Sequence, residues 1–162
     1  MRIVLIAMTL LAACARGAEQ QAAAPAPPDS AAALAAAEDL AQRYTQAWLA
    51  RDMTALGATF TENATAAFLG FPTTTGRSGI QALYQAAFDA LGVPKEGLLT
   101  VTSATGIAPG VLGALGLSRD TFDSSGTDRT THWRWAATLR QGADGQYRFS
   151  YLMAFPDSVV RK

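Results

Sequence analysis

Few side chains in this chain of 162 residues have the chemistry and spacing of a functional site, and the best placed are aromatic. Tyr44 and Trp48 are four residues apart, the spacing that brings two side chains onto one face of a helix. Each has two interpretations: a core residue whose polar atom finds one partner, or a hydrogen-bond donor into a pocket. Tyr44 is the one candidate for catalysis, and the identity of any catalytic base stays unknown.

A second aromatic pair, Trp133 and Trp135, lies in a segment with strand-like alternation. Successive side chains of a strand point to opposite faces, so the two tryptophans share one face while His132 and Arg134 share the other. The tryptophans are the better candidates for the inner face of a sheet. His132, the only histidine, is therefore expected outside.

The residue inventory argues against metal and cofactor chemistry. One histidine, one cysteine and no acidic cluster at ligand spacing predict no metal site. The glycines of 110–116 lack the lysine and the strand-to-helix context of a phosphate-binding loop, so no cofactor is expected. Lys+Arg and Asp+Glu both number 13, and without a basic stripe no nucleic-acid partner is expected.

The first residues predict export. Arg2 precedes a short apolar run that ends in small residues, as in a signal peptide over 1–13. Leu11-Ala12-Ala13-Cys14 resembles the lipobox of bacterial lipoproteins, which implies cleavage before Cys14 and lipidation of its thiol. That resemblance implies a membrane anchor in the cell envelope, at the outer rather than the inner membrane because Ala15 follows. An ordinary cleaved signal with an incidental cysteine is the alternative.

A tether and three helices are predicted next. Residues 14–32 are rich in Ala, Gln and Pro and read as the lipidated cysteine followed by a flexible tether. Apolar residues then recur at helical spacing. The expected elements are a helix from Ser30 to Trp48 capped by Asp29 or Ser30, a short helix from Asp52 to Phe60, a strand over 64–71, a loop over 72–76, and a helix after Arg77 that Ser78 caps and Gly92 ends.

The remainder predicts β structure. Strands are expected over 98–105, 119–123, 130–140 and 147–155, with a turn at 141–145. Strict alternation would put Phe149, Tyr151 and Phe155 on one face. The Gly-rich stretch 106–116 is interpreted as a loop, either a mobile lid or an insertion. The fold class is therefore α+β: a curved, mostly antiparallel sheet wrapped around an N-terminal helix, with two further helices and a conical cavity.

Two segments carry a family resemblance. Leu40 to Phe60, with Ala47-Trp48 and Arg51-Asp52, resembles the opening of SnoaL-like domains of the nuclear-transport-factor-2-like (NTF2-like) superfamily. Gly76-Arg77-Ser78-Gly79-Ile80-Gln81-Ala82-Leu83-Tyr84 resembles the third helix of that family, and the terminal hairpin also fits. The resemblance places one domain at 33–158 and implies a cone with an internal pocket and, in many members, a homodimer.

Within that superfamily, the first helix resembles the ketosteroid isomerase branch, in which a tyrosine at the Tyr44 position donates to an oxyanion. That chemistry also needs a carboxylate base and a second, protonated acid. Counting along this sequence puts the base at Phe68 and the second acid at Ala136 or Thr131. None is a carboxylate, so the resemblance argues against steroid isomerisation by that mechanism.

Three functions stay open. The first is binding of a small apolar or aromatic molecule in a pocket lined by Tyr44, Trp48, Phe68, Trp133 and Trp135. The second is an isomerase, cyclase or dehydratase that uses Tyr44, and the third is a non-catalytic dimerisation or assembly module. An enzyme requires an acid or base with a perturbed pKa inside the cavity, and the replaced carboxylates favour a non-enzyme.

Overall fold

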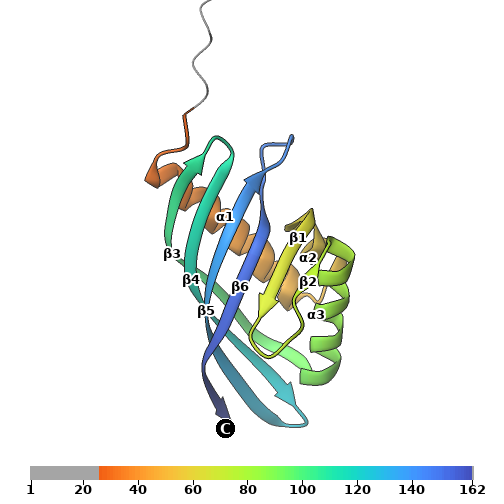
Figure 1. Ribbon diagram of the computed structural model, residues 1–162. Helices are drawn as coiled ribbons and strands as arrows, with labels where there is room; N and C mark the ends of the chain where they lie inside the picture. Colours follow the sequence, from red (N-terminus) through yellow and green to blue (C-terminus); the bar gives the residue numbers. More distant parts are fainter. Residues whose placement is uncertain (1–25, 162) are drawn as a thin grey trace, which may run out of the picture.

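The computed structural model describes residues 26–161, so the predicted signal peptide and Cys14 lie outside the described residues. Three helices and six strands make up this part of the chain, and the last four elements are all strands (Figure 1). In chain order they are α1 (Ser30–Leu49), α2 (Met53–Ala58), β1 (Phe60–Phe68), β2 (Thr74–Thr75), α3 (Arg77–Leu91), β3 (Val93–Ala108), β4 (Val111–Ser124), β5 (Thr127–Gln141) and β6 (Tyr147–Arg161).

Helix α1 forms where the sequence predicts it. The Asp29 side chain accepts a hydrogen bond from the Ala32 N–H at 2.8 Å, which satisfies one of the free donors at the helix start. The buried stripe is mostly alanine, with Leu40 and Trp48 as its large members. Small side chains let the helix lie close to the sheet: at Gly97 of β3, an added Cβ would lie 2.6 Å from the Trp48 ring.

The strands form one curved sheet in the order β2-β1-β6-β5-β4-β3. β1 pairs with β6 in parallel, and every other neighbouring pair is antiparallel. In Figure 1, α1 crosses one face of this sheet, while α2 and α3 lie beside β1 and β2. The sheet and helices enclose the core as a cone, which confirms the predicted α+β class.

The prediction of a Gly-rich loop over 106–116 is wrong, because β3 and β4 continue through it as a long hairpin. Its turn lies at Pro109 and Gly110, where Gly110 has a φ of 67°. Glycine is frequent in this stretch because neighbours cover the strand closely. A side chain at Gly116 would collide with the Trp135 ring and with the Thr100 carbonyl.

Two other predicted boundaries are corrected. β1 begins at Phe60 rather than at residue 64, and the two-residue strand β2 occupies the predicted loop at 72–76. Gly76, rather than Ser78, caps α3, with no side-chain hydrogen bond. Gly76 has a φ of 81°, and its N–H donates to the Ala64 carbonyl at 2.8 Å, so the cap residue also pairs with β1.

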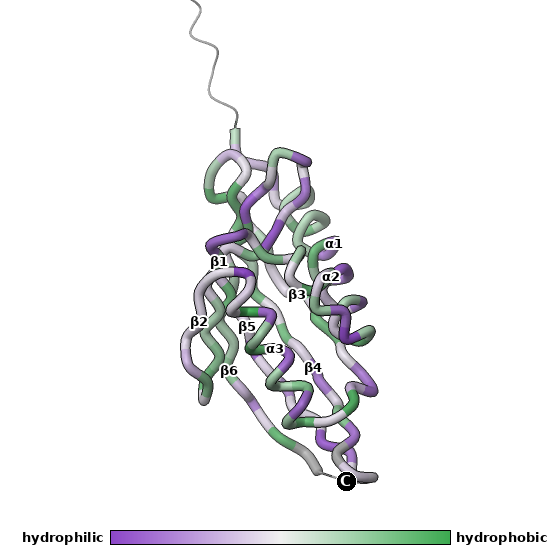
Figure 2. Tube along the Cα trace, turned by 90° about the vertical axis from the view of Figure 1, so that its right-hand side faces the viewer, coloured by the Kyte–Doolittle hydropathy of each residue, from purple (hydrophilic) through white to green (hydrophobic). Residues whose placement is uncertain are grey.

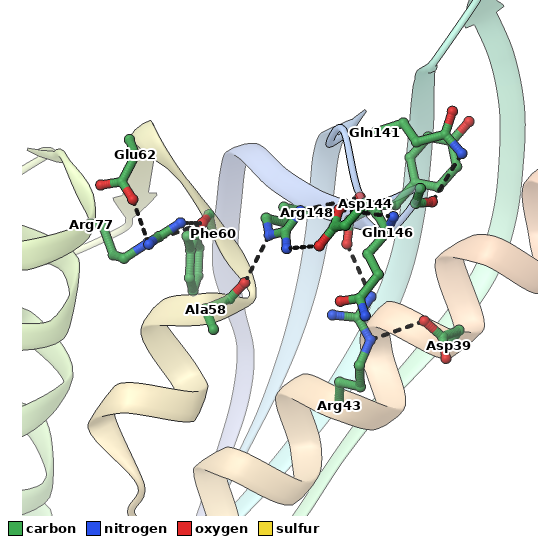
Figure 3. A network of polar contacts seen from close by, with 12 residues as sticks. Asp39, Arg43, Ala58, Phe60, Glu62, Arg77, Gln141, Asp144, Gln146 and Arg148 are labelled. Carbon is green, nitrogen blue, oxygen red and sulfur yellow. Dashed lines mark hydrogen bonds and ion pairs between the residues drawn. The ribbon is translucent and has the colours of Figure 1, made fainter.

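Arginines join the helices to the sheet at the surface (Figure 3). Arg43 of α1 donates to the Tyr147 carbonyl of β6 at 3.0 Å, and Arg77 of α3 donates to the Phe60 carbonyl at 2.9 Å. Arg148 donates to the Ala58 carbonyl at 3.2 Å. Hydrogen bonds from Arg148 hold the pKa of the Asp144 carboxyl well below its usual range. These contacts fix the helices over the concave face of the sheet.

Hydrophilic residues of α1 and α2 gather on the side away from the sheet (Figure 2). Such a division is expected of helices that bury one apolar stripe. Within residues 26–161, no helix combines the length and the apolar character needed to cross a membrane.

Candidate functional site

A cavity of about 320 Å³ lies between the helices and the concave face of the sheet. This volume is at the small end of the range of ligand pockets, about 300–1,000 Å³. Apolar and aromatic side chains make up most of its wall. The principal lining residues are Tyr44 of α1, Leu83, Tyr84, Ala87 and Leu91 of α3, Phe68 of β1, Asp120 and Phe122 of β4, Arg129, Thr131, Trp133 and Trp135 of β5, and Leu152 and Ala154 of β6.

Four of the five residues expected in the pocket line this cavity: Tyr44, Phe68, Trp133 and Trp135. Trp135 is only 4% exposed, and its ring meets Phe149 edge-on at 6.5 Å between centroids. The strand alternation therefore predicted the orientation of the tryptophans. His132 is not among the residues that line the cavity, as that alternation also predicted.

The fifth, Trp48, requires a correction, because it packs in the core and does not line the cavity. Its ring lies on Gly97 and meets Phe122 at 5.2 Å and Phe88 at 5.6 Å between centroids. Helical spacing placed Trp48 on the same face as Tyr44, but it could not predict whether the Trp48 ring reaches the cavity or lies in the packed core beside it. The core interpretation of Trp48 therefore holds.

Tyr44 is paired with a second tyrosine. The Tyr44 and Tyr84 hydroxyls are 2.8 Å apart, so one donates to the other and the second keeps a proton to donate. Burial raises the pKa of Tyr44 well above its ordinary value, and burial likewise raises the pKa of Tyr84. Both phenols are therefore neutral donors near pH 7. The sequence placed Tyr84 in the apolar stripe of the third helix, but nothing in its spacing revealed the pairing.

Asp120 is the functional candidate that the sequence did not reveal. Burial raises the pKa of its carboxyl to about 7, and a hydrogen bond from the Trp133 side chain lowers it in part. Part of the side chain is open to the cavity, while the surrounding protein removes most of it from bulk water. A carboxyl with this pKa is present in both protonation states near neutral pH, as proton transfer requires.

The register of the sheet explains why Asp120 escaped prediction. Counting put the second acid of the isomerase pattern at Thr131 or Ala136 on β5. Thr131 is the residue directly opposite Asp120 on the neighbouring strand β4. Asp120 therefore lies beside one of the counted positions, on a strand that the count did not consider. Phe68, where the count put the base, lines the cavity as an apolar side chain.

Two buried donors at the cavity have no partner within the described residues. They are the indole N–H of Trp135 and the Nε–H of Arg129. Buried polar groups are normally hydrogen-bonded, so each such donor calls for an explanation. Over the same range, no group of three or more His, Cys, Asp and Glu side chains could hold a metal ion.

Comparisons with known proteins identify the fold. No protein-family model matches the chain, and no curated protein sequence matches it. Among solved structures, it is similar to a ketosteroid isomerase-like protein from Erwinia carotovora atroseptica SCRI1043, with a TM-score of 0.68, 19% identity and coverage of 77% of this chain and 96% of the other.

Two further structures agree. The hexachlorocyclohexane dehydrochlorinase LinA-type3 from Novosphingobium barchaimii LL02 gives a TM-score of 0.67 at 15% identity, covering 82% of this chain and 91% of the other. An NTF2-like protein with a cystatin-like fold from Novosphingobium aromaticivorans gives 0.60 at 24% identity, covering 79% and 84%. The chain therefore has the NTF2-like fold that its resemblance to SnoaL-like domains implied. At these identities the likeness concerns the fold alone.

Proposed function

We propose that this domain binds a small, mainly apolar molecule that carries a hydrogen-bond acceptor. The observation that carries the proposal is the mainly apolar, aromatic cavity with the Tyr44–Tyr84 hydroxyl pair in its wall. An apolar wall with a few placed polar groups is the usual design of a small-molecule site. The phenols would orient the ligand by donating to its acceptor.

Asp120 supports a second candidate, in which the bound molecule also undergoes proton transfer. A carboxylate whose pKa is about 7 can take a proton from the carbon next to a carbonyl and return it to another carbon, which is an isomerisation. It can also take a proton from the carbon adjacent to a halogen-bearing carbon while halide leaves and a double bond forms, which is an elimination. The neutral tyrosine pair could stabilise negative charge as it develops. The cavity thus holds the acid or base with a perturbed pKa that an enzyme would require. The reaction classes that fit are isomerisation and elimination.

The test of binding uses paired substitutions on α3. Ala87 lines the cavity and its neighbour Ala86 is exposed. Ala87→Phe should fill the cavity, and Ala86→Phe should leave it open. The mature chain with Cys14→Ser, purified gently, would be examined by native mass spectrometry for a retained small molecule and titrated with the neutral dye N-phenyl-1-naphthylamine. Binding in the parent and in Ala86→Phe, lost in Ala87→Phe, supports the proposal; equal binding in all three contradicts it.

We further propose that a lipid on Cys14 anchors the domain to a bacterial membrane, through a tether that ends where α1 begins at Ser30. Support comes from the Leu11-Ala12-Ala13-Cys14 segment alone. Mass spectrometry of the N-terminal peptide from cell membranes should find an acylated Cys14. If the Cys14→Ser variant distributes between the membrane and soluble fractions as the parent does, the proposed anchor is contradicted.

Pairing of two copies is a third part of the proposal. The convex face of the sheet carries an exposed apolar patch, here called the convex patch, made of Leu115, Leu117, Tyr151 and Phe155. Leu115 and Leu117 lie on β4, and Tyr151 and Phe155 lie on β6. On β5 between them, Ala136 pairs with Leu115 and Met153, whereas Arg134 stands between Leu117 and Phe155. Exposed apolar side chains gathered on one face and bordered by polar residues are typical of interaction surfaces.

A further inference from the structure

One charged side chain in the cavity wall has no role in the binding described so far. Arg129 lies on the concave face of β5, in alternation with Thr131, Trp133 and Trp135, all of which line the cavity. It stands opposite Phe122 of β4, so its nearest cross-strand neighbour is an aromatic ring. A guanidinium stays charged at every accessible pH, so the apolar cavity carries a permanent positive charge at this point.

Arg129 also lacks the partner that other cations have. Within the described residues, ion pairs hold Arg43, Arg51, Arg77, Lys95, Arg119, Arg134 and Arg148. Among the arginines of residues 26–160, Arg129 and Arg140 make none, and Arg140 is exposed to water. The Nε of Arg129 is instead buried without a hydrogen bond. A buried donor on a charged group is costly unless a partner arrives.

The two ends of the cavity differ, and Arg129 lies at one of them. Trp135 lies six residues further along β5, about 20 Å at the rise of a strand. Trp135 is deeply buried, while Val159, which pairs with Thr131 near Arg129, is 46% exposed. The cavity therefore has an apolar, enclosed end and a cationic end near its rim. A molecule with an apolar body and one anionic group matches both.

We propose that the ligand of the cone is an organic anion, most simply an aromatic or alicyclic carboxylate, whose anionic group is bound by Arg129. A carboxylate accepts two parallel hydrogen bonds from a guanidinium, which would satisfy the buried Nε–H. The apolar body would then lie toward Trp133 and Trp135. This inference rests on the proposed binding function and adds the chemical class of the ligand.

Asp120 is the competing partner for Arg129. The two side chains are diagonal neighbours on the concave face, since Asp120 faces Thr131 and Arg129 faces Phe122. Diagonal neighbours come within reach of long side chains, yet no ion pair joins these two residues. If Arg129 served only to neutralise Asp120, the cavity would show no preference for an acid over its neutral analogue.

The test compares 2-naphthoate with 2-naphthamide, which has nearly the same shape and no charge. Each would displace the neutral dye N-phenyl-1-naphthylamine from the mature chain with Cys14→Ser, at about pH 6, where Asp120 is mostly protonated. The parent should bind the acid about tenfold more tightly than the amide, a difference of about 1.4 kcal/mol. Arg129→Gln should abolish that preference while the dye still binds, and Arg129→Lys should keep part of it.

Arg140→Gln is the matched control, because it removes the same charge from the same strand outside the cavity. It should keep the full preference for the acid. Equal affinity for acid and amide in the parent, or a preference that persists in Arg129→Gln, would overturn the inference while leaving dye binding intact. Failure of the dye and of both naphthalenes to bind would instead overturn the proposed binding function itself.

Discussion

At the scale of single residues, the cavity contains a few polar groups that are partly or fully buried. Asp120, Arg129 and the two tyrosines are set in a wall that is otherwise apolar and aromatic. Low polarity strengthens whatever hydrogen bonds a ligand makes there and raises the cost of leaving these groups unpaired. Stability and function are therefore coupled at these positions, and substitutions should reveal that coupling.

Asp120→Asn should stabilise the domain in a pH-dependent way. The pKa of Asp120 is about 7 in the fold against 3.8 ordinarily. Between these two pH values, the folded state holds a proton that the unfolded state has already lost. Raising the pH through this window therefore favours unfolding. Asn cannot ionise, so the variant should match the parent at about pH 4 and exceed its stability by about 2–4 kcal/mol at about pH 8.

Urea unfolding at both pH values would measure this difference, with Asp89→Asn on the exposed face of α3 as the control. That control should show no gain at the higher pH. An Asp120→Asn variant whose stability relative to the parent is the same at both pH values would show that the carboxyl is not desolvated in the fold.

The tyrosine pair should behave as a unit. Tyr44→Phe leaves the Tyr84 hydroxyl without its 2.8 Å partner, and Tyr84→Phe does the same to Tyr44. Each single variant should lose about 1–3 kcal/mol of unfolding free energy, because one buried hydroxyl is then unpaired. The double variant should lose no more than either single one, since no orphan hydroxyl remains.

Chemical denaturation of the three variants provides the double-mutant cycle. Tyr151→Phe, at a position 39% exposed on the convex face, is the control and should change stability little. Additive losses in the double variant would mean that the two hydroxyls do not depend on one another and that each has a different hydrogen-bond partner.

At the scale of the elements, local signals predicted the three helices and the last two strands, whereas β2 was predicted as a loop and β3 was expected to end at residue 105. Asp29, one of the two caps predicted for the first helix, and Asp52, the predicted start of the second, each accept a hydrogen bond from the backbone three residues on. Capping and helical periodicity depend on residues within one or two turns, so they can be read from a short window. The α+β class followed from the order of these elements.

Long-range pairing was the part that the sequence could not provide. Alternation placed Phe149 on the same face as Tyr151, but Phe149 is 1% exposed in the core while Tyr151 is 39% exposed. A register shift between Thr138 and Leu139, opposite Ser150, reverses the face between them. The same limitation hid Asp120, because its role follows from a cross-strand neighbour rather than from any adjacent motif.

The hairpin of β3 and β4 gives a prediction for one of its glycines. Gly116→Ala should destabilise the domain by about 1–3 kcal/mol, because the new methyl group would overlap the Thr100 carbonyl and the Trp135 ring. Displacement of Trp135 should also weaken binding of N-phenyl-1-naphthylamine. Thermal unfolding and a dye titration would measure both effects.

Gly113→Ala is the matched control on the same strand. A methyl group there would meet only the flexible end of Ile107 at 3.2 Å, which can move. It should leave stability and dye binding close to those of the parent. If the two glycine variants behave alike, the close packing of Trp135 on β4 does not shape the cavity.

At the scale of the whole molecule, one curved sheet presents two different surfaces. Its concave face, covered by the helices, holds Asp120, Arg129 and the tryptophans. Its convex face carries the convex patch, whose Leu117 is 48% exposed and Phe155 42% exposed. Pro27 and Pro28, which precede α1, are not among the residues that line the cavity.

The proposed pairing of two copies makes the last prediction. A second copy is the simplest occupant of the convex patch, because a two-fold axis would lay Leu115 and Leu117 of one copy against the same residues of the other. Leu117→Lys adds a charge to each side of that contact, and like charges brought together in an apolar interface oppose association. Since Leu117 is already half exposed, the variant should fold normally. In sedimentation of the mature chain with Cys14→Ser, the parent should be a dimer and Leu117→Lys a monomer. Ile107→Lys, 61% exposed near the tip of the β3–β4 hairpin, should remain a dimer.

If the parent sediments as a monomer at every concentration, the prediction of a dimer is wrong, and the occupant of the convex patch would be a different protein. Because the cavity opens on the other side of the sheet, binding of the neutral dye should be the same in Leu117→Lys as in the parent, and a loss of binding on dissociation would mean that pairing holds the cone in shape.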